Sequence, residues 1–485
     1  MINWKLLSKI LGQLLGIEAV MLAVCLVMSI CCHGSDWLAF TFSLAVTCFF
    51  SGLLQRLGRD ASSFMHRRDA YLIVSLTWVV FSALGAIPFV ASGYVPSITD
   101  AFFETMSGFT TTGATLIEDV ESLPRALLFW RSLTQWIGGL GIVFFTIAII
   151  PSIIEGGLRV FSAEATGPLR NKLHPRLSIT AKWIWGIYVL LTAVCAILFW
   201  VEGMSPFDSV NYAMTATATG GFATHNASTG YFHNPYIDYT AIAFMLLSGI
   251  SFSLLYMALL KGRIRDFFRN SELRLFLFLI AAATIFISFT LMRKCHYEAE
   301  DAFRSSLFQV VSFATTTGIF NDDAGQWPHI TWVVLSVLMF FGGCSGSTAG
   351  GFKCIRGVMV LEVVRNELRR VLHPRAVLPV RVNKQPVPFS TQATLLGYFA
   401  LYLMLCLLTY FIMILTGVDS TNSITIALSC ASNVGPTLGL EIGPTMSWNV
   451  LPDLVKWLLT LLMLMGRLEI VSVVVLFTRS FWRDR

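Results

Sequence analysis

Four short stretches of the chain combine small polar residues with a glycine at a regular spacing. They are residues 107–113, 214–220, 312–318 and 429–435, and each ends at its glycine. A hydroxyl stands three residues before every glycine, in Thr110, Thr217, Thr315 and Ser432. Nine residues before it stand Glu104, Asn211, Gln309 and Ile426, so only the fourth stretch lacks a polar residue there. Self-similarity at a nearly constant period indicates an internal repeat.

Stretches of this kind could bind a cation through their backbone. Rings of carbonyl oxygens can replace the hydration shell of an ion. Aligning successive carbonyls requires a residue with positive φ, which glycine adopts at little cost. A short helix that ends at the stretch would also direct its negative end toward the ion. The alternative is a set of ordinary polar loops, but four equivalent stretches favour the ion site.

We therefore predict ion-binding residues in each stretch, around its glycine. They are Thr111, Thr112 and Gly113; Ala218, Thr219 and Gly220; Thr316, Thr317 and Gly318; and Asn433, Val434 and Gly435. The fourth set departs most from the pattern, because Asn433 and Val434 replace threonines. We expect the ion sites to deviate from strict fourfold symmetry at this stretch.

The composition identifies the setting of these stretches. Of 485 residues, 55% are apolar and 13% are charged, and the mean hydropathy is +0.70. A typical soluble domain is about 25% charged. These values exclude a disordered protein, a nucleic-acid-binding module and an ordinary cytosolic enzyme. They require a membrane protein with many spans.

Ten apolar stretches are long enough to cross a bilayer, which takes about 20 residues. They are residues 8–30, 36–55, 70–92, 126–153, 181–201, 238–260, 274–292, 329–360, 393–417 and 452–478. Most of the 34 basic residues fall in alternate loops, which the positive-inside rule places in the cytoplasm together with both termini. The four glycine stretches then lie on the outer side. They are too short and polar to span, so we expect re-entrant loops.

The predicted fold is an all-α integral membrane protein with ten spans. Residues 1–69 form two extra N-terminal helices, and the last eight spans form four linked helix–pore loop–helix repeats around a central ion pore. The predicted repeats are residues 70–160, 161–272, 273–385 and 386–485, and the third contains a glycine-rich segment.

The eighth apolar segment has two interpretations. It contains Gly342, Gly343, Gly346, Gly350 and Gly351 within ten residues. Glycines spaced by four are typical of close helix–helix contacts. Alternatively, five glycines lower helix propensity enough to break the helix into a loop. A phosphate-binding loop does not fit, because Phe352 stands where the motif requires lysine.

Two basic residues lie where a charge is costly. Arg467 is near the middle of the last span, so it must face water or a partner. Glu469 is close in sequence, but residues two apart do not face each other on a helix. A salt bridge to another helix or a subunit interface is one interpretation, and a charge lining the pore is the other. Lys353 is either a second pore cation or a lysine reaching the cytoplasmic edge.

The motifs resemble those of the TrkH/TrkG/KtrB superfamily of potassium transport proteins, which also includes the HKT transporters. The matching sequences are Thr111–Thr115, Thr219–Phe222, Thr316–Phe320, Asn433–Thr437, Arg131–Gly139 and Gly342–Gly351. The resemblance covers nearly the whole chain, and the two extra N-terminal spans favour the TrkH type over the shorter KtrB type. It implies potassium uptake through a channel-like pore with a four-loop carbonyl selectivity filter.

The resemblance also implies a gate and partners. In the family the glycine-rich segment is an intramembrane loop below the filter, so Gly346, Gly350, Gly351, Lys353 and Arg467 become gate residues. It further implies a homodimer in the bacterial inner membrane and a cytosolic TrkA-type regulatory subunit. We expect potassium in the filter, no cofactor in this chain, nucleotide on the regulatory subunit, membrane lipid around the chain, and no nucleic acid.

Two other functions compete with a pore. A Na⁺- or H⁺-coupled secondary transporter needs acids or histidines at mid-membrane. Here all eight histidines fall in loops or near span ends, and Glu18 and Glu469 are the only clear midspan acids. A membrane enzyme is disfavoured because the chain has no paired carboxylates, no H-E-x-x-H and no G-x-S-x-G.

Overall fold

The computed structural model describes residues 2–62, 65–141, 177–259, 261–376, 378–383, 385–439 and 442–483. Within these ranges the regular secondary structure is helical, apart from one small hairpin, in which β1 (Arg381–Val382) pairs antiparallel with β2 (Gln385–Pro386). The short 3₁₀ turns are η1 (Val120–Ser122), η3 (Ser228–Phe232), η4 (Ala324–Gln326) and η5 (Val475–Phe477).

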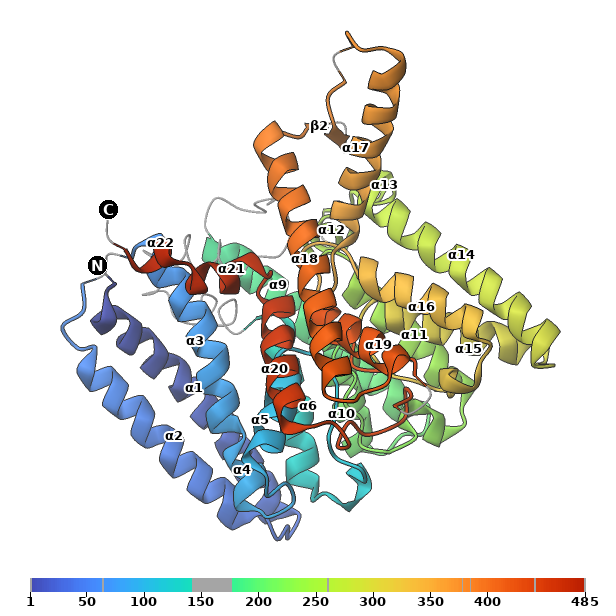
Figure 1. The fold of residues 1–485 in the computed structure, drawn as a ribbon. Helices are drawn as coiled ribbons and strands as arrows, with labels where there is room; N and C mark the ends of the chain where they lie inside the picture. Colours follow the sequence, from blue (N-terminus) through green and yellow to red (C-terminus); the bar gives the residue numbers. More distant parts are fainter. Residues whose placement is uncertain are drawn as a thin grey trace.

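The first two helices form a layer at one side of the molecule. Helix α1 (Trp4–Cys31) packs against α2 (Trp37–Leu57), and both contact α3 (Arg67–Gly85). Figure 1 shows this group in blue, next to the rest of the bundle. Helices α1 and α2 therefore lie outside the part of the chain that carries the glycine stretches.

The remaining chain repeats one pattern, a long helix, a short helix and a second long helix. The first unit holds α3, α4 (Ile87–Ala91), α5 (Ile98–Phe109) and α6 (Arg125–Gly139), and the second holds α9 (Leu177–Val201), α10 (Pro206–Ala218) and α11 (Pro235–Gly249). The third holds α14 (Ser271–Lys294), α15 (Ala299–Ala314) and α16 (His329–Phe341), and the fourth α18 (Phe389–Leu415), α19 (Ser420–Ser432) and α20 (Asp453–Arg467). The predicted boundary between the first two repeats, at residues 160 and 161, lies outside the described residues.

Local sequence fixes where the short helices begin. Side-chain oxygens of Ser97, Ser205 and Asp419 accept hydrogen bonds from backbone N–H groups in the first turns of α5, α10 and α19. Pro206 follows at the first position of α10, where its missing N–H costs nothing. Such caps satisfy donors that would otherwise be orphaned, and each contributes about 1 kcal/mol. The short helices can therefore hold their position at membrane depth.

The four units close on one another in a ring. Each short helix contacts a long helix of its own unit and one of the preceding unit. Thus α10 contacts α6, α15 contacts α11, and α19 contacts α16. The ring is completed by α5, which contacts α20 from the far end of the chain. The C-terminal ends of the short helices, and the glycine stretches that follow them, are brought together by this packing.

Helices of spanning length and composition surround the ring. Six single helices of the described chain qualify: Trp4–Cys31, Trp37–Leu57, Arg68–Ala91, Ala181–Val201, Ser271–Lys294 and Phe389–Leu415. Two further segments qualify only as bent pairs. Helix α11 and α12 (Phe252–Leu259) meet at 103°, and α20 meets Val471–Phe477 at 113°. The chain is thus an all-α, multi-pass membrane protein.

The bends differ from the continuous spans expected at 238–260 and 452–478. A turn after Gly249 interrupts the first, and there the Phe252 N–H donates to the Gly346 carbonyl at 2.9 Å. The second breaks after Arg467, where Glu469 has φ 59°. Apolar composition alone does not predict such breaks in a helix. The expected span at 126–153 extends beyond the described residues.

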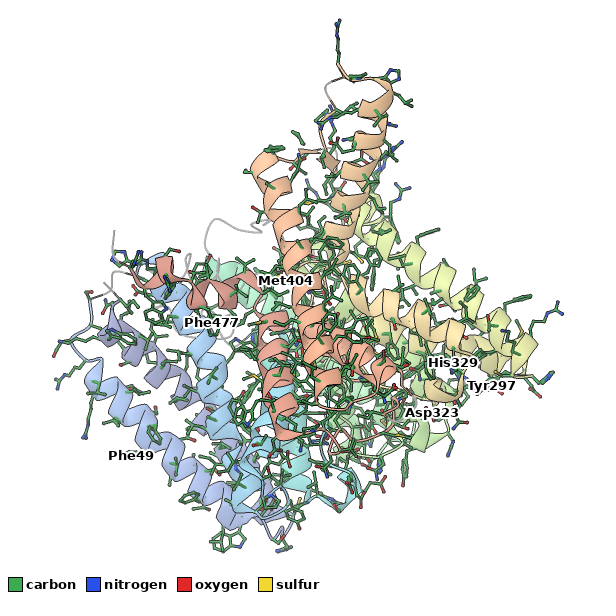
Figure 2. The ribbon with its side chains drawn as sticks, viewed as in Figure 1. Phe49, Tyr297, Asp323, His329, Met404 and Phe477 are labelled. Carbon is green, nitrogen blue, oxygen red and sulfur yellow. The ribbon has the colours of Figure 1, made fainter. Side chains whose placement is uncertain are left out.

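Apolar side chains cover the outer faces of the spanning helices. Phe49 on α2 is 65% exposed and Met404 on α18 is 57% exposed, and Figure 2 shows Phe49 at the outer edge of the molecule. A surface of this kind suits lipid rather than water. The polar residues of the four glycine stretches lie inside the ring instead.

Four further helices lie in the described part of the chain: α13 (Ile264–Arg269), α17 (Cys354–Leu372), α21 (Val471–Val474) and α22 (Arg479–Trp482). Of these, α17 is by far the longest. Figure 1 shows α17 projecting beyond the ends of the other helices, with β2 of the small hairpin beside the end of α18.

Candidate ion-binding site

Each short helix ends in the same backbone conformation. A left-handed residue ends the helix in all four units: φ is 53° at Thr111, 52° at Thr219, 56° at Thr316 and 55° at Asn433. It is the C-cap of α10 and α19 and the residue after the C-cap of α5 and α15. A glycine with positive φ stands two residues later, at Gly113, Gly221, Gly318 and Gly435. In each unit the N–H of the residue between these two donates to a carbonyl five residues back. This is the hydrogen bond of a Schellman helix end.

This conformation corrects the alignment of the second stretch by one residue. The sequence comparison aligned Gly220 with the other three glycines, but the backbone aligns Gly221 with them. The N–H of Gly220 bonds Thr215, just as the N–H of Thr112 bonds Ser107. Gly220 therefore takes the position of Thr112, and Ala218 takes that of Thr110. In this register the columns of hydroxyl and polar residues contain Ala218 and Tyr212 in place of Thr217 and Asn211.

The four glycines are in contact around a closed ring. A methyl group added to Gly113 would collide with the carbonyl of Gly220, and one added to Gly221 would collide with that of Thr317. One added to Gly318 would collide with the Val434 carbonyl. The ring closes because the same group on Gly435 would collide with the Thr112 carbonyl. Four backbone segments far apart in the chain therefore meet at one place, where no side chain fits.

Hydroxyl groups support the first and third loops in the same way. Thr110 and Thr112 bond through their Oγ1 atoms at 2.8 Å, and Thr315 and Thr317 do so at 2.7 Å. The hydroxyl of Ser107 donates to the Ala114 carbonyl at 2.6 Å, and that of Ser312 donates to Ile319 at the same distance. These bonds join the end of each short helix to the strand-like segment beyond the glycine.

Amide side chains support the second and fourth loops. Gln135 Nε2, from α6, donates to the Gly220 carbonyl at 2.6 Å, and its Oε1 accepts from the Phe222 N–H at 3.1 Å. Asn433 Nδ2 donates to Thr112 Oγ1 at 3.0 Å and to the Met463 carbonyl at 2.9 Å. Gln135 thus links the second loop to α6 of the first unit. Asn433 links the fourth loop to the first loop and to α20.

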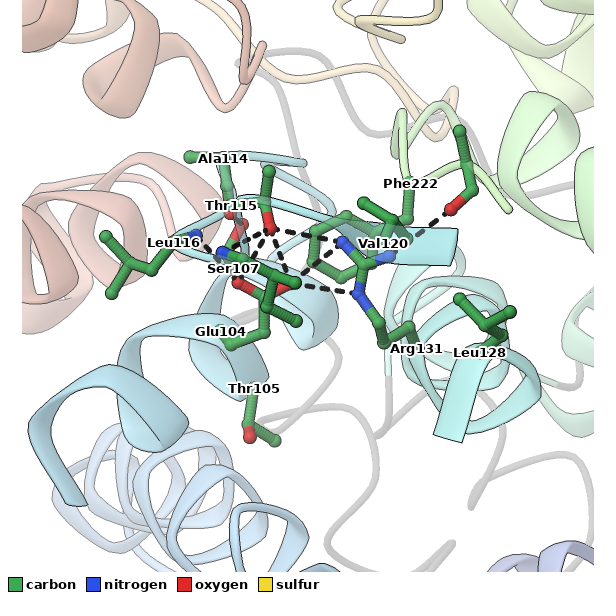
Figure 3. Close-up of polar contacts among 12 residues, drawn as sticks. Glu104, Thr105, Ser107, Ala114, Thr115, Leu116, Val120, Leu128, Arg131 and Phe222 are labelled. Carbon is green, nitrogen blue, oxygen red and sulfur yellow. Dashed lines mark hydrogen bonds and ion pairs between the residues drawn. The ribbon is translucent and has the colours of Figure 1, made fainter. Parts of the chain in front are cut away.

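A buried ion pair between Arg131 and Glu104 supports the first two loops just after their glycines. Arg131 and Glu104 are 2% and 1% exposed, and Arg131 Nε donates to Glu104 Oε1 at 2.9 Å. The carboxylate also accepts from the Leu116 N–H at 3.1 Å. Arg131 Nη1 donates to the Ala223 carbonyl at 3.2 Å, and the guanidinium carbon lies 4.1 Å from the Phe222 ring centroid. Figure 3 shows these contacts converging on Arg131.

Sequence reasoning did not assign roles to Arg131 and Gln135. Both were noted only as parts of a motif in the fourth apolar segment. The available signal was their spacing of four, which places two strongly polar side chains on one face of a buried helix. A buried charge requires a partner, and Glu104 was already marked by its place in the repeat.

The glycine-rich segment is a loop, as one of its two interpretations predicted. Helix α16 ends at Phe341 and α17 begins at Cys354, and Gly342, Gly346, Gly351 and Lys353 all have positive φ in between. A continuous helix with glycine contacts is therefore excluded. We refer to residues 342–353 as the gate loop.

The gate loop lies against the inner ends of three of the four short helices. Thr348 Oγ1 donates to the Thr217 carbonyl at 3.2 Å, and the Gly350 N–H donates to Thr316 Oγ1 at 2.6 Å. Gly350 packs so closely on the Ser432 carbonyl that a Cβ would collide with it. Because these contacts reach three units of the ring, the loop lies at its centre.

Arg467 connects the gate loop to the remaining unit. It is the last residue of α20, and its Nη1 donates to the Thr348 carbonyl at 2.8 Å. Its Nη2 donates to the carbonyls of Gly138 and Gly139, each at 2.5 Å. The guanidinium thus lies beneath the ring, bonded to backbone of the first and third units.

The other charged residues near the loop have partners. Lys353 is 3% exposed and its Nζ donates to the Ala349 carbonyl, so it does not extend to the cytoplasmic edge. Glu469 forms an ion pair with Arg356, whose guanidinium carbon also lies 4.0 Å from the Tyr398 ring centroid. The acid nearest to Arg467 in sequence therefore pairs with a different cation.

Taken together, the ring and its loops define a class: a multi-pass membrane protein of four linked helix–loop–helix units, whose loops meet at a backbone-lined centre. Residues 38–484 match the TrkH family, described as cation transport proteins, and the chain belongs to that family. It is a family of transporters and not of enzymes.

Known relatives resemble the chain over almost its full length. It is 38% identical to the Trk system potassium uptake protein TrkH of Halomonas elongata, over 99% of both chains. It is also 38% identical to the protein of that name from Escherichia coli K12, over 92% of both. The crystal structure of the potassium transporter TrkH from Vibrio parahaemolyticus superposes with a TM-score of 0.89, at 32% identity, covering 99% of this chain and 100% of that one.

Proposed function

We propose that this protein takes up potassium ions across the bacterial inner membrane through a channel-like pore. The observation that carries the proposal is the closed ring of glycine contacts, which leaves only backbone around one axis. Backbone carbonyls in such a ring can take the place of the water around K⁺. The name shared by the relatives, potassium uptake protein, supports the choice of ion.

In this proposal the ion is held by the four loops in the register that the backbone defines. The binding residues are Thr111–Gly113, Thr219–Gly221, Thr316–Gly318 and Asn433–Gly435. Gly221 enters the set, and Ala218, at the end of α10, stands at its inner edge. The chain has ten spans with both termini in the cytoplasm, and the bent segments and the gate loop count among these spans.

The gate loop and Arg467 form the closed gate of this pore. Gly346, Gly350 and Gly351 give the loop its shape, Lys353 fixes its end, and Arg467 places a positive charge beneath the ring. A cationic side chain on the path of a cation is an electrostatic barrier. We further propose a homodimer whose gate is controlled by a cytosolic nucleotide-binding subunit of the TrkA type.

Growth and flux measurements test the transport reaction. The protein should rescue growth of a potassium-uptake-deficient strain at low K⁺, and the rescue should improve when the regulatory subunit is co-expressed. Purified protein in liposomes should carry Rb⁺ down its gradient without a gradient of H⁺ or Na⁺. An obligatory coupling ratio with either ion would instead establish a secondary transporter.

The Arg467→Ala variant tests the gate. Removing the charge should raise Rb⁺ flux by about tenfold, since a charge in a low-dielectric pore contributes well over 1 kcal/mol to the barrier. Arg293→Ala is the matched control, because Arg293 is an exposed arginine at the end of α14. Unaltered or lower flux in a correctly folded Arg467→Ala protein would assign the residue a structural role.

A further inference from the structure

A buried carboxylate binds both ends of the gate loop. Glu272, the second residue of α14, is 5% exposed. Its Oε1 atom accepts a hydrogen bond from the Ser345 N–H at 2.5 Å and another from the Ile355 N–H at 3.1 Å. One oxygen atom therefore fixes a backbone position in the first half of the loop and another at the start of α17.

The two bonded positions flank the part of the loop that contacts the ring. Between them lie Thr348 and Gly350, which contact the inner ends of the short helices. Hydrogen bonds to a charged acceptor are about twice as strong as bonds between neutral groups. The carboxylate lies on α14, in a different helix from either end of the loop, so it attaches the loop to the wall of the bundle.

The same turn of α14 is attached to the small hairpin. Asn383, at the hairpin turn, accepts hydrogen bonds through its Oδ1 from the backbone N–H and the hydroxyl of Ser271, at 2.8 and 2.9 Å. Asn270 caps the helix by accepting from the Glu272 N–H at 2.9 Å. The hairpin is thus hydrogen-bonded to Ser271, and Glu272, the next residue of α14, is hydrogen-bonded to the gate loop.

We propose that Glu272 is a positioning residue that holds the gate loop in its closed form, and that the hairpin acts on the gate through it. The second part rests on the proposed function, because it requires the loop to be a gate. Displacing the hairpin would shift Ser271 and with it the carboxylate. Both loop ends would then lose their common acceptor.

Two conservative substitutions separate the effect of side-chain length at Glu272 from the effect of its charge. Glu272→Gln keeps an oxygen at the same distance from the helix and removes the charge. Glu272→Asp keeps the charge and shortens the side chain by one methylene, so that one oxygen can no longer reach both N–H groups. If Glu272 acts by position, the Asp variant should release the loop and the Gln variant should retain it. A purely electrostatic role predicts the reverse order.

The native cysteines report the loop directly. Cys344 and Cys354 lie at its two ends and are fully buried, whereas Cys31 and Cys32 are exposed. Alkylation of the full-length protein in liposomes, quantified for each peptide by mass spectrometry, should be about tenfold faster at Cys344 and Cys354 in Glu272→Asp than in wild type. That factor corresponds to the loss of one hydrogen bond to a charged group. Cys430, buried in α19, should remain unreactive in both.

Matched variants and a second readout complete the test. Glu298→Asp, at an exposed N-cap of α15, is the control for the substitution itself. Asn383→Gly removes the hairpin amide while suiting the left-handed turn at that residue (φ 50°), and should cause a smaller increase in labelling. Rb⁺ flux should rise in the same order. Wild-type labelling of Cys344 and Cys354 in Glu272→Asp would overturn the proposal.

The two readouts distinguish the two levels of inference. If neither the wild type nor Arg467→Ala carries Rb⁺, the proposed function fails, yet labelling still decides whether Glu272 holds the loop. If the wild type carries Rb⁺ and labelling does not respond to Glu272, the proposed function stands and this inference fails. If labelling responds to Glu272 and not to Asn383, the link to the hairpin is overturned.

Discussion

The first and third loops differ from the second and fourth in how the same backbone is held. All four share a left-handed residue and a glycine of positive φ. In loops one and three, hydroxyls within the loop bond one another. Gly220 and Val434 replace the second of these threonines in loops two and four, and amides of Gln135 and Asn433 provide the support. The ring is therefore fourfold in its backbone, while the side chains that support it differ from loop to loop.

This difference shows which feature the repeat has to preserve. Carbonyl position depends on the backbone, and several side-chain arrangements can secure it. Left-handed backbone also favours Asn over a β-branched residue. Asn433 therefore lies in a conformation that suits it, while the threonines at the equivalent positions depend on their surroundings. We expect the two pairs of loops to respond differently to substitution.

The largest effect should come from the glycines, which both pairs share. Gly113→Ser and Gly318→Ser should each lower the ratio of K⁺ to Na⁺ flux by more than about tenfold. A left-handed side chain alone costs roughly 1–2 kcal/mol, and each Cβ would also strike a neighbouring carbonyl. Competition fluxes with Rb⁺ and Na⁺ measure the ratio. Unchanged selectivity in both variants would remove these loops from the filter.

The second loop offers a test of register, with the next largest effect. Gly221→Ala should impair selectivity as severely as a change at Gly113, because its Cβ would collide with the Thr317 backbone. Gly220→Ala should be milder, since its Cβ would meet only the Gln135 side chain. The same competition fluxes apply. A more severe defect at Gly220 would restore the alignment made from sequence.

Removing the amide support of loop two should have a larger effect than removing a hydroxyl support. Gln135→Leu leaves the Gly220 carbonyl and the Phe222 N–H without this partner, at a cost of about 1–3 kcal/mol for each buried group. Thr317→Val, which leaves the shape of the side chain unchanged, is the matched change in loop three, where hydroxyls support the backbone as they do in loop one. Thermal unfolding in detergent should show a larger decrease for Gln135→Leu. Equal decreases would mean that the two kinds of support are equivalent.

The smallest effect is expected from a substitution that gives the fourth loop the threonine that the other three loops have at the left-handed position. Asn433→Thr introduces a β-branched residue at φ 55° and removes the bonds to Thr112 and Met463. The loss should be about 1–2 kcal/mol in stability, with selectivity changed severalfold at most. Asn433→Asp, which keeps a residue suited to this backbone, is the control. Higher stability of the Thr variant would contradict a role for the amide.

The repeat could be predicted from the sequence because the features that define it are local. Span-length apolar segments, capped short helices and a Thr–Gly stretch at each helix end are properties of neighbouring residues. The one-residue error in loop two has a local cause as well. Gly220 and Gly221 are adjacent, and only the hydrogen bond from the Gly220 N–H to Thr215 decides which one turns the chain.

The supporting residues were not accessible in the same way, because their partners lie far apart in the chain. Gln135 reaches Gly220, Asn433 reaches Thr112, and Arg356 pairs with Glu469. A polar residue in an apolar segment indicates that a partner exists, but hydrophobic periodicity does not identify it. The interpretation of Lys353 as a lysine at the membrane edge was wrong for this reason, since the loop buries it.

The sequence by itself determined the class of protein, the repeated unit and the family, because apolar length, charge asymmetry and glycine spacing are encoded residue by residue. The tertiary structure decided how the units meet: the closed order of the loops, the breaks after Gly249 and Arg467, and the carboxylate that holds the gate loop. These features depend on contacts between distant segments. The contact of α20 with α5 closes the ring, and the bond from the Phe252 N–H to Gly346 joins the second unit to the third at the first break.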